Sequence, residues 1–167
     1  MSRSGVFGSE EKNVPDVPAA RPVSARPNLV TSAGLAQLRA SETELVRRRE
    51  QMMLAGHDPV QDDEIRLVDR DLVYVRARLG SAVLVETHTA GQVGFGATVT
   101  VREDQGGEQQ TWTVVGEDEA DPDRGKISYA SPLAAALEGV RTGQTVRFRR
   151  PLGDVDLTVL AVRYDAG

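Results

Sequence analysis

A run of acidic side chains in the first half of the chain has the residue types needed for metal-assisted chemistry. The carboxylates are those of Asp58, Asp62, Asp63 and Glu64. Carboxylate oxygens are the ligands that hard cations such as Mg²⁺ prefer. Concentrated at an exposed turn, they could help to position a metal ion and orient an attacking water.

The same segment also has the features of a helix N-terminus. Asp58 is suited to the N-cap, Pro59 to the first helical position and Gln61 to the capping-box position. The three acidic residues that follow would each favour the positive end of the helix dipole by about 0.3 to 1 kcal/mol. Helix capping and metal assistance therefore remain two open interpretations of this segment.

Arginines cluster on both sides of the acidic segment. Arg47, Arg48 and Arg49 precede it, and Arg66 and Arg70 follow it. Their guanidinium groups could contact RNA phosphates or an acidic protein surface. A solvated helix face is the other interpretation of the same residues.

Two helical patterns of nearly equal length flank the acidic segment. The first has an N-cap at Thr31 or Ser32, and the second covers about residues 59–79. Apolar residues recur at heptad spacing in both, as in a coiled coil. They are Leu38, Leu45 and Met52 in the first helix and Ile65, Val68, Leu72, Val75 and Leu79 in the second. Equal arms joined by the short connector 55–58 predict an antiparallel hairpin, and one seam per helix predicts that it projects into solvent.

From residue 82 onward the pattern changes to short β segments separated by glycines. Strands are expected at 82–86, 97–103, 111–115, 145–148 and 155–164. One short helix is expected at 132–137, with Ser131 as its N-cap and Pro132 at its first position. The sequence therefore predicts an α+β fold in three parts: a disordered tail (1–28), an antiparallel coiled-coil finger (29–81) and a β-rich C-terminal domain (82–167).

The composition excludes several classes of site. The chain has no cysteine and only two histidines, which excludes disulfides, thiolate zinc sites and histidine-rich metal sites. Its net charge of −5 does not fit a duplex DNA binder. No apolar run approaches the roughly 20 residues of a membrane span, and residues 1–28 lack the features of a secretory signal. A cytoplasmic protein without membrane association is expected.

Four blocks of sequence resemble the C-terminal domain of the Gre transcript-cleavage factors. They are residues 95–101, 114–121, 125–134 and 159–164, in the order and approximate spacing of the family. The resemblance implies an FKBP-like β fold without isomerase activity. It also implies docking on RNA polymerase, near the rim of the secondary channel, through Ser131, Pro132 and Leu133. The local sequence alone indicates that these residues start a helix, and both roles can hold together.

The finger resembles the same family in architecture, with two departures. Gre factors carry the motif Asp-x-x-Glu-Asn at the tip of an antiparallel coiled coil. Asp58 falls on the Asp of this motif, but Gln61 stands at its Glu and Asp62 at its Asn. Each helical arm is also shorter than in the family by about six residues, roughly 9 Å.

The resemblance implies a monomer that binds bacterial RNA polymerase, inserts its finger into the secondary channel and reaches the displaced RNA 3′ end. The favoured hypothesis is a factor that modulates elongation without stimulating cleavage. The alternative is a true cleavage factor whose tip carboxylates hold the second catalytic Mg²⁺ jointly with the polymerase. In both cases the chain has no cofactor of its own, holds no metal alone and is not itself an enzyme. A peptidyl-prolyl isomerase is disfavoured, because the C-terminal domain has few aromatic residues for a substrate groove.

Overall fold

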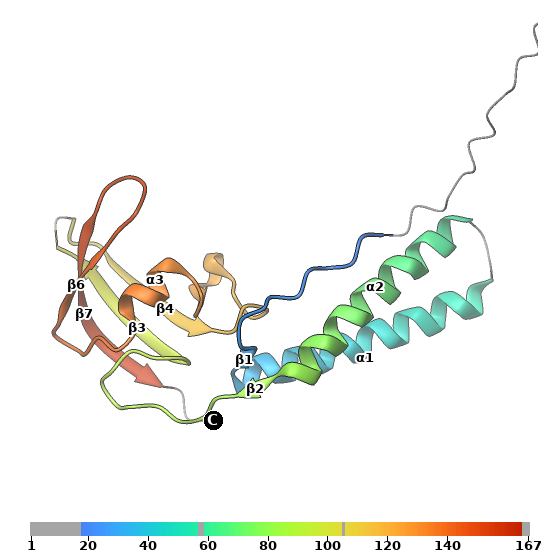
Figure 1. Ribbon diagram of the computed structural model, residues 1–167, viewed down its shortest axis with the longest axis horizontal. Helices are drawn as coiled ribbons and strands as arrows, with labels where there is room; N and C mark the ends of the chain where they lie inside the picture. The colour runs from blue at the N-terminus through green and yellow to red at the C-terminus, as the bar shows by residue number, and fades with distance from the viewer. Residues whose placement is uncertain (1–17, 57–58, 105, 165–167) are drawn as a thin grey trace, which may run out of the picture.

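Two long helices project from a curved five-stranded sheet in this computed structural model (Figure 1). The structure describes residues 18–56, 59–104 and 106–164. The helices are α1 (Ser32–Ala55) and α2 (Pro59–Ser81). No helix within the described ranges is both long and apolar enough to cross a membrane. The α+β class expected from the sequence is confirmed.

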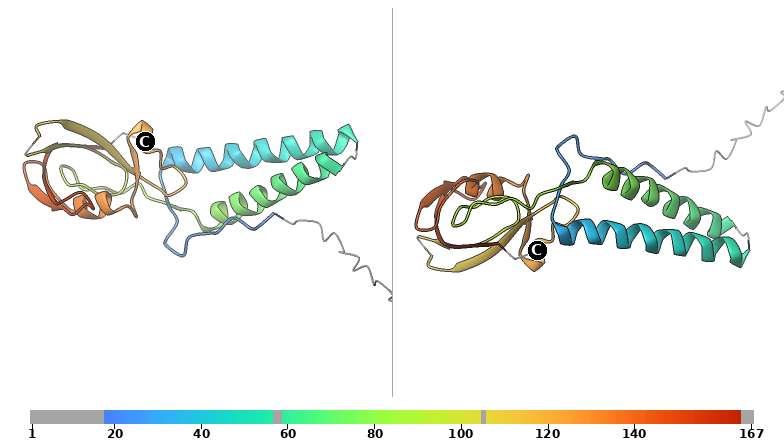
Figure 2. Two further views of the ribbon diagram at one scale, coloured as in Figure 1. Left: turned by 90° about the horizontal axis from the view of Figure 1, so that it is seen from above. Right: turned by 90° about the horizontal axis from the view of Figure 1, so that it is seen from below.

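The helices α1 and α2 form the antiparallel hairpin that their equal lengths predicted. They contain 24 and 23 residues, so each is about 35 Å long. Thr31 is the N-cap of α1, because its hydroxyl accepts a hydrogen bond from the Gly34 amide at 2.9 Å. Figure 2 shows the two helices side by side, extending away from the β domain. The hairpin therefore projects, as expected for helices that pair only with each other.

The heptad seam holds the two helices together. Its buried members are Leu38 on α1 and Ile65, Val68, Leu72 and Val75 on α2. Leu45, Met52 and Leu79 are half-buried. Burial of apolar surface is the main stabilising contribution here, at about 25 cal/mol per Å² removed from water. The predicted coiled-coil seam is confirmed.

Two very short strands close the hairpin at its base. β1 (Leu29–Val30) pairs in parallel with β2 (Val83–Leu84). Asn28, which precedes β1, is buried, and its amide donates to the Arg78 carbonyl at 2.6 Å. The same amide nitrogen lies 3.2 Å from the Ser81 hydroxyl. Asn28 thereby satisfies part of the last turn of α2, whose carbonyls lack partners within the helix.

The β domain is a single sheet in the order β5-β4-β3-β7-β6. Its strands are β3 (Ala97–Glu103), β4 (Gln109–Val115), β5 (Lys126–Ser128), β6 (Thr145–Phe148) and β7 (Val155–Tyr164). Alternate residues of β3 are buried, as the period of a strand requires. Val99 and Val101 of β3 share one core with Ala134 and Leu137 of α3 (Pro132–Leu137). This core lies within the β domain and does not include the hairpin seam.

Three elements were not expected from the sequence: β1, β5 and the 3₁₀ helix η1 (Pro122–Arg124). Each has only two or three residues, which is too few to show a period. β4 begins at Gln109, two residues earlier than expected, and β2 covers only part of the segment expected at 82–86. The other expected strands and the short helix have their expected bounds.

The N-terminal segment differs in part from the expectation of a disordered tail over residues 1–28. Residues 1–17 lie outside the described part of the chain. Residues 18–28 form no helix or strand, but they lie beside α2 (Figures 1 and 2). Arg21, Pro27 and Asn28 in this segment make specific contacts with the hairpin or the β domain.

The seam makes a prediction about stability. Leu72 is 4% exposed, so Leu72→Ala should lower the free energy of unfolding of the hairpin by about 2 to 3 kcal/mol, because the cavity on a two-helix stalk can partly collapse. Urea denaturation followed by circular dichroism at 222 nm measures this loss. Val73→Ala is the matched control, since the Val73 side chain is 69% exposed on the same helix. Equal losses for the two variants would contradict the seam.

Candidate functional site

The tip of the hairpin is closed by a hydrogen bond between its two helices. The side-chain amide of Gln61, in the first turn of α2, donates to the Met52 carbonyl in the last turn of α1 at 2.6 Å. Gln61 is the residue that departs from the acidic motif expected at this place. It therefore has a structural role in joining the ends of α1 and α2.

The acidic residues that the structure describes at the tip, Asp62, Asp63 and Glu64, do not form a metal-binding cluster. Asp63 pairs with Arg66 on the same helix, and the Glu64 carboxylate lies 4.0 Å from Arg48 of α1. Asp62 is half-buried in the first turn of α2. Asp58 lies outside the described residues. Among the residues that the structure describes, no three acidic or histidine side chains are placed to share a metal ion.

Apolar side chains are prominent at the end of the hairpin. Leu54 is 87% exposed, Val60 is 71% exposed and Met53 is 45% exposed. These residues lie in the last turn of α1 and the first turn of α2, on either side of the connector. The described surface of the tip is thus apolar as well as acidic.

The arginines expected to contact RNA phosphates or an acidic protein surface are paired with carboxylates of the hairpin. Arg47 binds Glu44 at 2.6 Å, and the hydrogen bond from Arg47 lowers the pKa of the Glu44 carboxyl. Arg49 binds Asp69 across the two helices at 2.5 Å. Arg48 faces Glu64, Arg66 binds Asp63 and Arg70 binds Asp71. The positive charge of the stalk is therefore largely compensated, and binding of phosphates by these arginines would require them to exchange partners.

The three residues predicted to dock on a partner have different surroundings. Ser131 caps α3, its hydroxyl accepting a hydrogen bond from the Ala134 amide at 3.2 Å. Leu133 is half-buried against the core of the β domain. Pro132, at the first position of α3, is exposed. The helix-starting role predicted for this corner is confirmed, and Pro132 is the member most available to a partner.

An acidic loop of the β domain contacts the base of the hairpin, and these contacts, made by Glu117, Asp118 and Glu119, are here called the joint. The loop follows β4 and contains Glu117, Asp118 and Glu119 in succession. The Asp118 carboxylate accepts hydrogen bonds from the Arg78 guanidinium and from the Tyr74 hydroxyl, both at 2.5 Å. The Arg78 side chain is 2% exposed, and Glu117 lies 3.6 Å from it. Two carboxylates of the β domain thus neutralise a buried cation of α2.

Tyr74 takes part in this joint as a hydrogen-bond donor. Burial, together with the hydrogen bond to Asp118 and its negative charge, raises the pKa of the Tyr74 phenol above its ordinary value. The phenol therefore stays protonated at neutral pH and can continue to donate to Asp118.

The third carboxylate of the loop contacts the start of α1. Glu119 accepts a hydrogen bond from the Thr31 hydroxyl at 2.6 Å and one from Lys126 at 3.3 Å. A carboxylate at this position is also favoured by the positive end of the helix dipole. A methyl group at Gly34 would lie 2.5 Å from the Glu119 carboxylate, so that a side chain here would displace the carboxylate from its present position. The acidic loop therefore binds both helices at their common base.

Backbone packing brings the loop to this position. A Cβ atom on Gly116 would lie 2.5 Å from the Leu29 carbonyl oxygen, closer than side chains tolerate. The absence of a side chain at Gly116 lets the end of β4 pass directly beside β1. Close backbone approach is a common reason for glycine in such a place.

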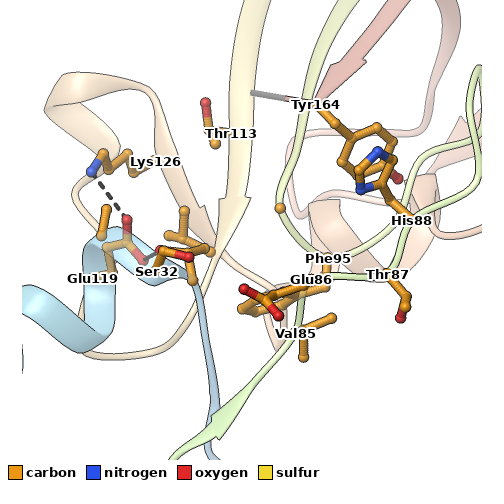
Figure 3. Close-up of a pocket in the computed structure, with 14 residues that line it drawn as sticks. Ser32, Val85, Glu86, Thr87, His88, Phe95, Thr113, Glu119, Lys126 and Tyr164 are labelled. Carbon is orange, nitrogen blue, oxygen red and sulfur yellow. Dashed lines mark hydrogen bonds and ion pairs between the residues drawn. The ribbon is translucent and has the colours of Figure 1, made fainter. Parts of the chain in front are cut away.

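An open cavity of about 610 Å³ lies beside the joint. In Figure 3, Ser32, Glu119 and Lys126 line one side of it, and the rings of His88 and Tyr164 line the other. These two rings are stacked with their centroids 4.2 Å apart. The cavity separates the start of α1 from the linker that follows β2.

Sequence reasoning missed the residues of the joint, although two signals for them were present. Glu117, Asp118 and Glu119 belong to a block that carries the family resemblance, yet they were given no role. Arg78 directly precedes Leu79, the last position of the seam, and a charged residue so close to the seam can become buried. The partners are 40 residues apart in sequence, so no local pattern could pair them.

Comparisons with known proteins give consistent results. Residues 87–164 match the family described as "Transcription elongation factor, GreA/GreB, C-term". The transcription elongation factor GreA of Desulfovibrio desulfuricans is 30% identical over 152 residues, covering 86% of this chain and 93% of that protein. GreA of Thioalkalivibrio sulfidiphilus is 41% identical over 93 residues, covering 54% of this chain and 59% of that protein.

The share of each relative's length that matches this chain differs from one relative to the next. The chain spans 59% of the length of the Thioalkalivibrio protein and about half of the Chloroflexus aggregans GreA. The Desulfovibrio match is longer than residues 82–167 and therefore includes the hairpin. Among solved structures, Gfh1 of Thermus aquaticus is 27% identical, with 83% of this chain and 99% of that chain covered and a TM-score of 0.41.

The joint makes a prediction about the buried arginine. Asp118→Asn should lower the free energy of unfolding by about 3 kcal/mol, because it leaves the Arg78 charge buried with only the more distant Glu117 to offset it. Asp156→Asn is the matched control, since Asp156 forms an exposed pair with Arg147 at 2.9 Å and should leave stability nearly unchanged. Chemical denaturation of both variants measures the difference. A loss for Asp118→Asn no larger than for Asp156→Asn would show that the joint contributes little.

Proposed function

Because the chain belongs to the GreA/GreB family of transcription elongation factors, we propose that it binds bacterial RNA polymerase and inserts the α1–α2 hairpin into the secondary channel. There it modulates elongation without stimulating cleavage of the transcript. The chain acts as a monomer on the active site of the polymerase and is not itself an enzyme. It works in the bacterial cytoplasm, where the polymerase is found.

The side chain of Gln61 carries this proposal. Cleavage by the family is attributed to a tip Asp and Glu, and Gln61 stands at the position of the Glu. Its amide is engaged with the Met52 carbonyl at 2.6 Å, and an amide is a weaker ligand for Mg²⁺ than a carboxylate because it carries no charge. The nearby Asp63 and Glu64 are paired with arginines. The tip is therefore better suited to occupying a channel than to delivering a metal ligand.

The shape of the hairpin supports insertion into a channel. Two helices about 35 Å long extend away from the β domain, and no third helix of the described residues packs on them (Figure 2). Their outer faces carry paired charges together with exposed apolar side chains, among them Leu54, Val60 and Val73. Such a stalk can enter a narrow polar channel without exposing its seam. Arg47, Arg48 and Arg49 would then contact the channel wall or the RNA 3′ end by exchanging their present partners.

A true cleavage factor is the second candidate, and the acidic content of the tip favours it. Asp62, Asp63 and Glu64 follow one another in the first two turns of α2, and Asp58 precedes them. In this alternative, Asp58 and one of the other three would hold the second catalytic Mg²⁺ jointly with the polymerase. The carboxylate of Asp63 or Glu64 would first have to leave its arginine.

A transcript-cleavage assay on halted, backtracked polymerase separates the two candidates. We expect no increase in cleavage on adding the protein, but a loss of the cleavage stimulated by a GreA relative, because both occupy one channel. If the protein itself stimulates cleavage and Asp58→Asn abolishes this at unchanged polymerase binding, the second candidate is correct. Asp58→Asn suits this test because Asn is as good an N-cap as Asp.

Gln61→Glu restores the second carboxylate of the family motif and tests the length of the finger. We expect little or no cleavage from this variant, since each arm is shorter by about six residues, roughly 9 Å. Gln61→Ala is its control, because it removes the hydrogen bond to Met52 without adding a charge. Strong cleavage with Gln61→Glu alone would mean that the missing carboxylate, and not finger length, limits activity.

Docking through the start of α3 gives a separate prediction. Pro132→Ala should weaken binding to core polymerase several-fold, because Pro132 is the exposed residue of the proposed corner. Alanine is accepted at the first helical position, so α3 should keep its structure. Leu152→Ala is the matched control, since Leu152 is 96% exposed on the β6–β7 loop. Unchanged affinity for Pro132→Ala, measured by biolayer interferometry, would exclude this contact.

A further inference from the structure

Residues 18–28, here called the strap, connect the hairpin to the β domain by a second route. The strap lies beside α2 and leads into β1 at the base of the hairpin (Figures 1 and 2). It lies outside the matched family region of residues 87–164. Arg21 contacts the hairpin, Pro27 contacts the β domain, and Asn28, where the strap meets β1, bonds to the end of α2.

Arg21 anchors the strap to the hairpin. Its guanidinium carbon lies 3.8 Å from the centroid of the Tyr74 ring, an arrangement in which the ring quadrupole attracts the cation. The same guanidinium lies 3.6 Å from the Asp71 carboxylate. Tyr74 in turn donates its hydroxyl to Asp118 of the acidic loop. Arg21 therefore packs on a side chain that already joins the hairpin to the β domain.

Tyr129 anchors the other end of the strap. Its hydroxyl donates to the Pro27 carbonyl at 2.5 Å. The Tyr129 ring is held in place by an edge-on contact with Phe95, with the ring centroids 5.9 Å apart. Tyr129 follows directly after β5. This anchor therefore belongs to the β domain.

The chain between the two anchors is short, bends at residues 25 and 26, and is stiffened by prolines. Pro22 and Pro27 stand at the ends of the segment 22–27. Proline fixes its own φ and favours an extended conformation in the residue before it, which here includes Arg21. A stiff segment attached at both ends resists movement of one attachment point relative to the other.

We propose that the strap is a releasable lock that holds the hairpin at one angle to the β domain. Swinging the hairpin about its base would separate Tyr74 from Tyr129 and break an anchor of the strap. Both anchors are accessible, since the Arg21 side chain is 44% exposed and the Tyr129 hydrogen bond lies at the surface. The lock can thus open while the buried Arg78 pair stays intact. This inference concerns the joint alone and does not rest on the proposed function.

The absence of cysteine allows a direct measurement of the hairpin angle. Spin labels at Leu54→Cys, near the end of α1, and Gln110→Cys, on β4, report the distance between the tip and the sheet by pulsed electron paramagnetic resonance. Both side chains are exposed. The length of the stalk, about 35 Å, converts a small rotation at the base into a large change at Leu54.

The lock is tested by removing its anchors from the full-length labelled chain. In Arg21→Ala with Tyr129→Phe, the width of the distance distribution should at least double relative to the parent. Arg26→Ala is the matched control and should leave the width unchanged, because no contact of the Arg26 side chain is seen within the described residues. Deletion of residues 1–26 should broaden the distribution as much as the double variant, with helix content checked by circular dichroism.

Two results would overturn the proposal. One is an unchanged distribution in both the double variant and the deletion, which would mean that the acidic loop alone sets the angle. The other is equal broadening in Arg26→Ala, which would mean that any change in the segment disturbs the joint. Polymerase is absent from this measurement, so its outcome is independent of the proposed function.

Discussion

The buried guanidinium of Arg78 is the interaction on which the relation between the hairpin and the β domain depends. A charge with 2% exposure is costly to remove from water unless it is paired and hydrogen-bonded. Asp118 supplies the hydrogen-bonded partner and Glu117 a second negative charge. Since both carboxylates belong to the β domain, α2 is stable in its observed position only when its C-terminal turns meet the acidic loop.

Apolar packing stabilises the hairpin and the β domain separately, whereas ion pairs and hydrogen bonds connect the two. Apolar burial holds α1 to α2 and the sheet to α3, and neither core extends across the joint. The joint itself consists of ion pairs and hydrogen bonds, as is common between domains of one chain. Such contacts fix the position of the hairpin relative to the β domain, because each carboxylate bonds to particular side chains of the hairpin. The connection through Arg21 and Tyr129 adds a second set of polar and aromatic contacts between the hairpin and the β domain.

The sequence predicted the parts more fully than their connection. Leu72 and its seam neighbours were identified because a heptad period is visible within a single segment. The long strands β3 and β7 were identified because β-branched and apolar residues gather between glycines. Arg78 and Asp118 were not identified as partners, because an ion pair between distant segments leaves no period in either. The pairing of Glu64 with Arg48 was missed for the same reason, since it depends on how α1 and α2 align.

At the tip of the hairpin, position 61 can hold either an amide that bonds to the end of α1 or a carboxylate that could bind a metal ion. The last four carbonyls of a helix have no partner within it, and at the end of α1 the Gln61 amide satisfies that of Met52. Glutamate at this position could not donate to the carbonyl when ionised. It would also place a negative charge near the negative end of the α1 dipole. An ionised glutamate at this position would be favoured by the positive end of the α2 dipole, but it could not make the hydrogen bond to Met52 that joins the two helices. The amide of Gln61 thus gives the end of the hairpin a hydrogen bond between its helices that a carboxylate at this position could not donate.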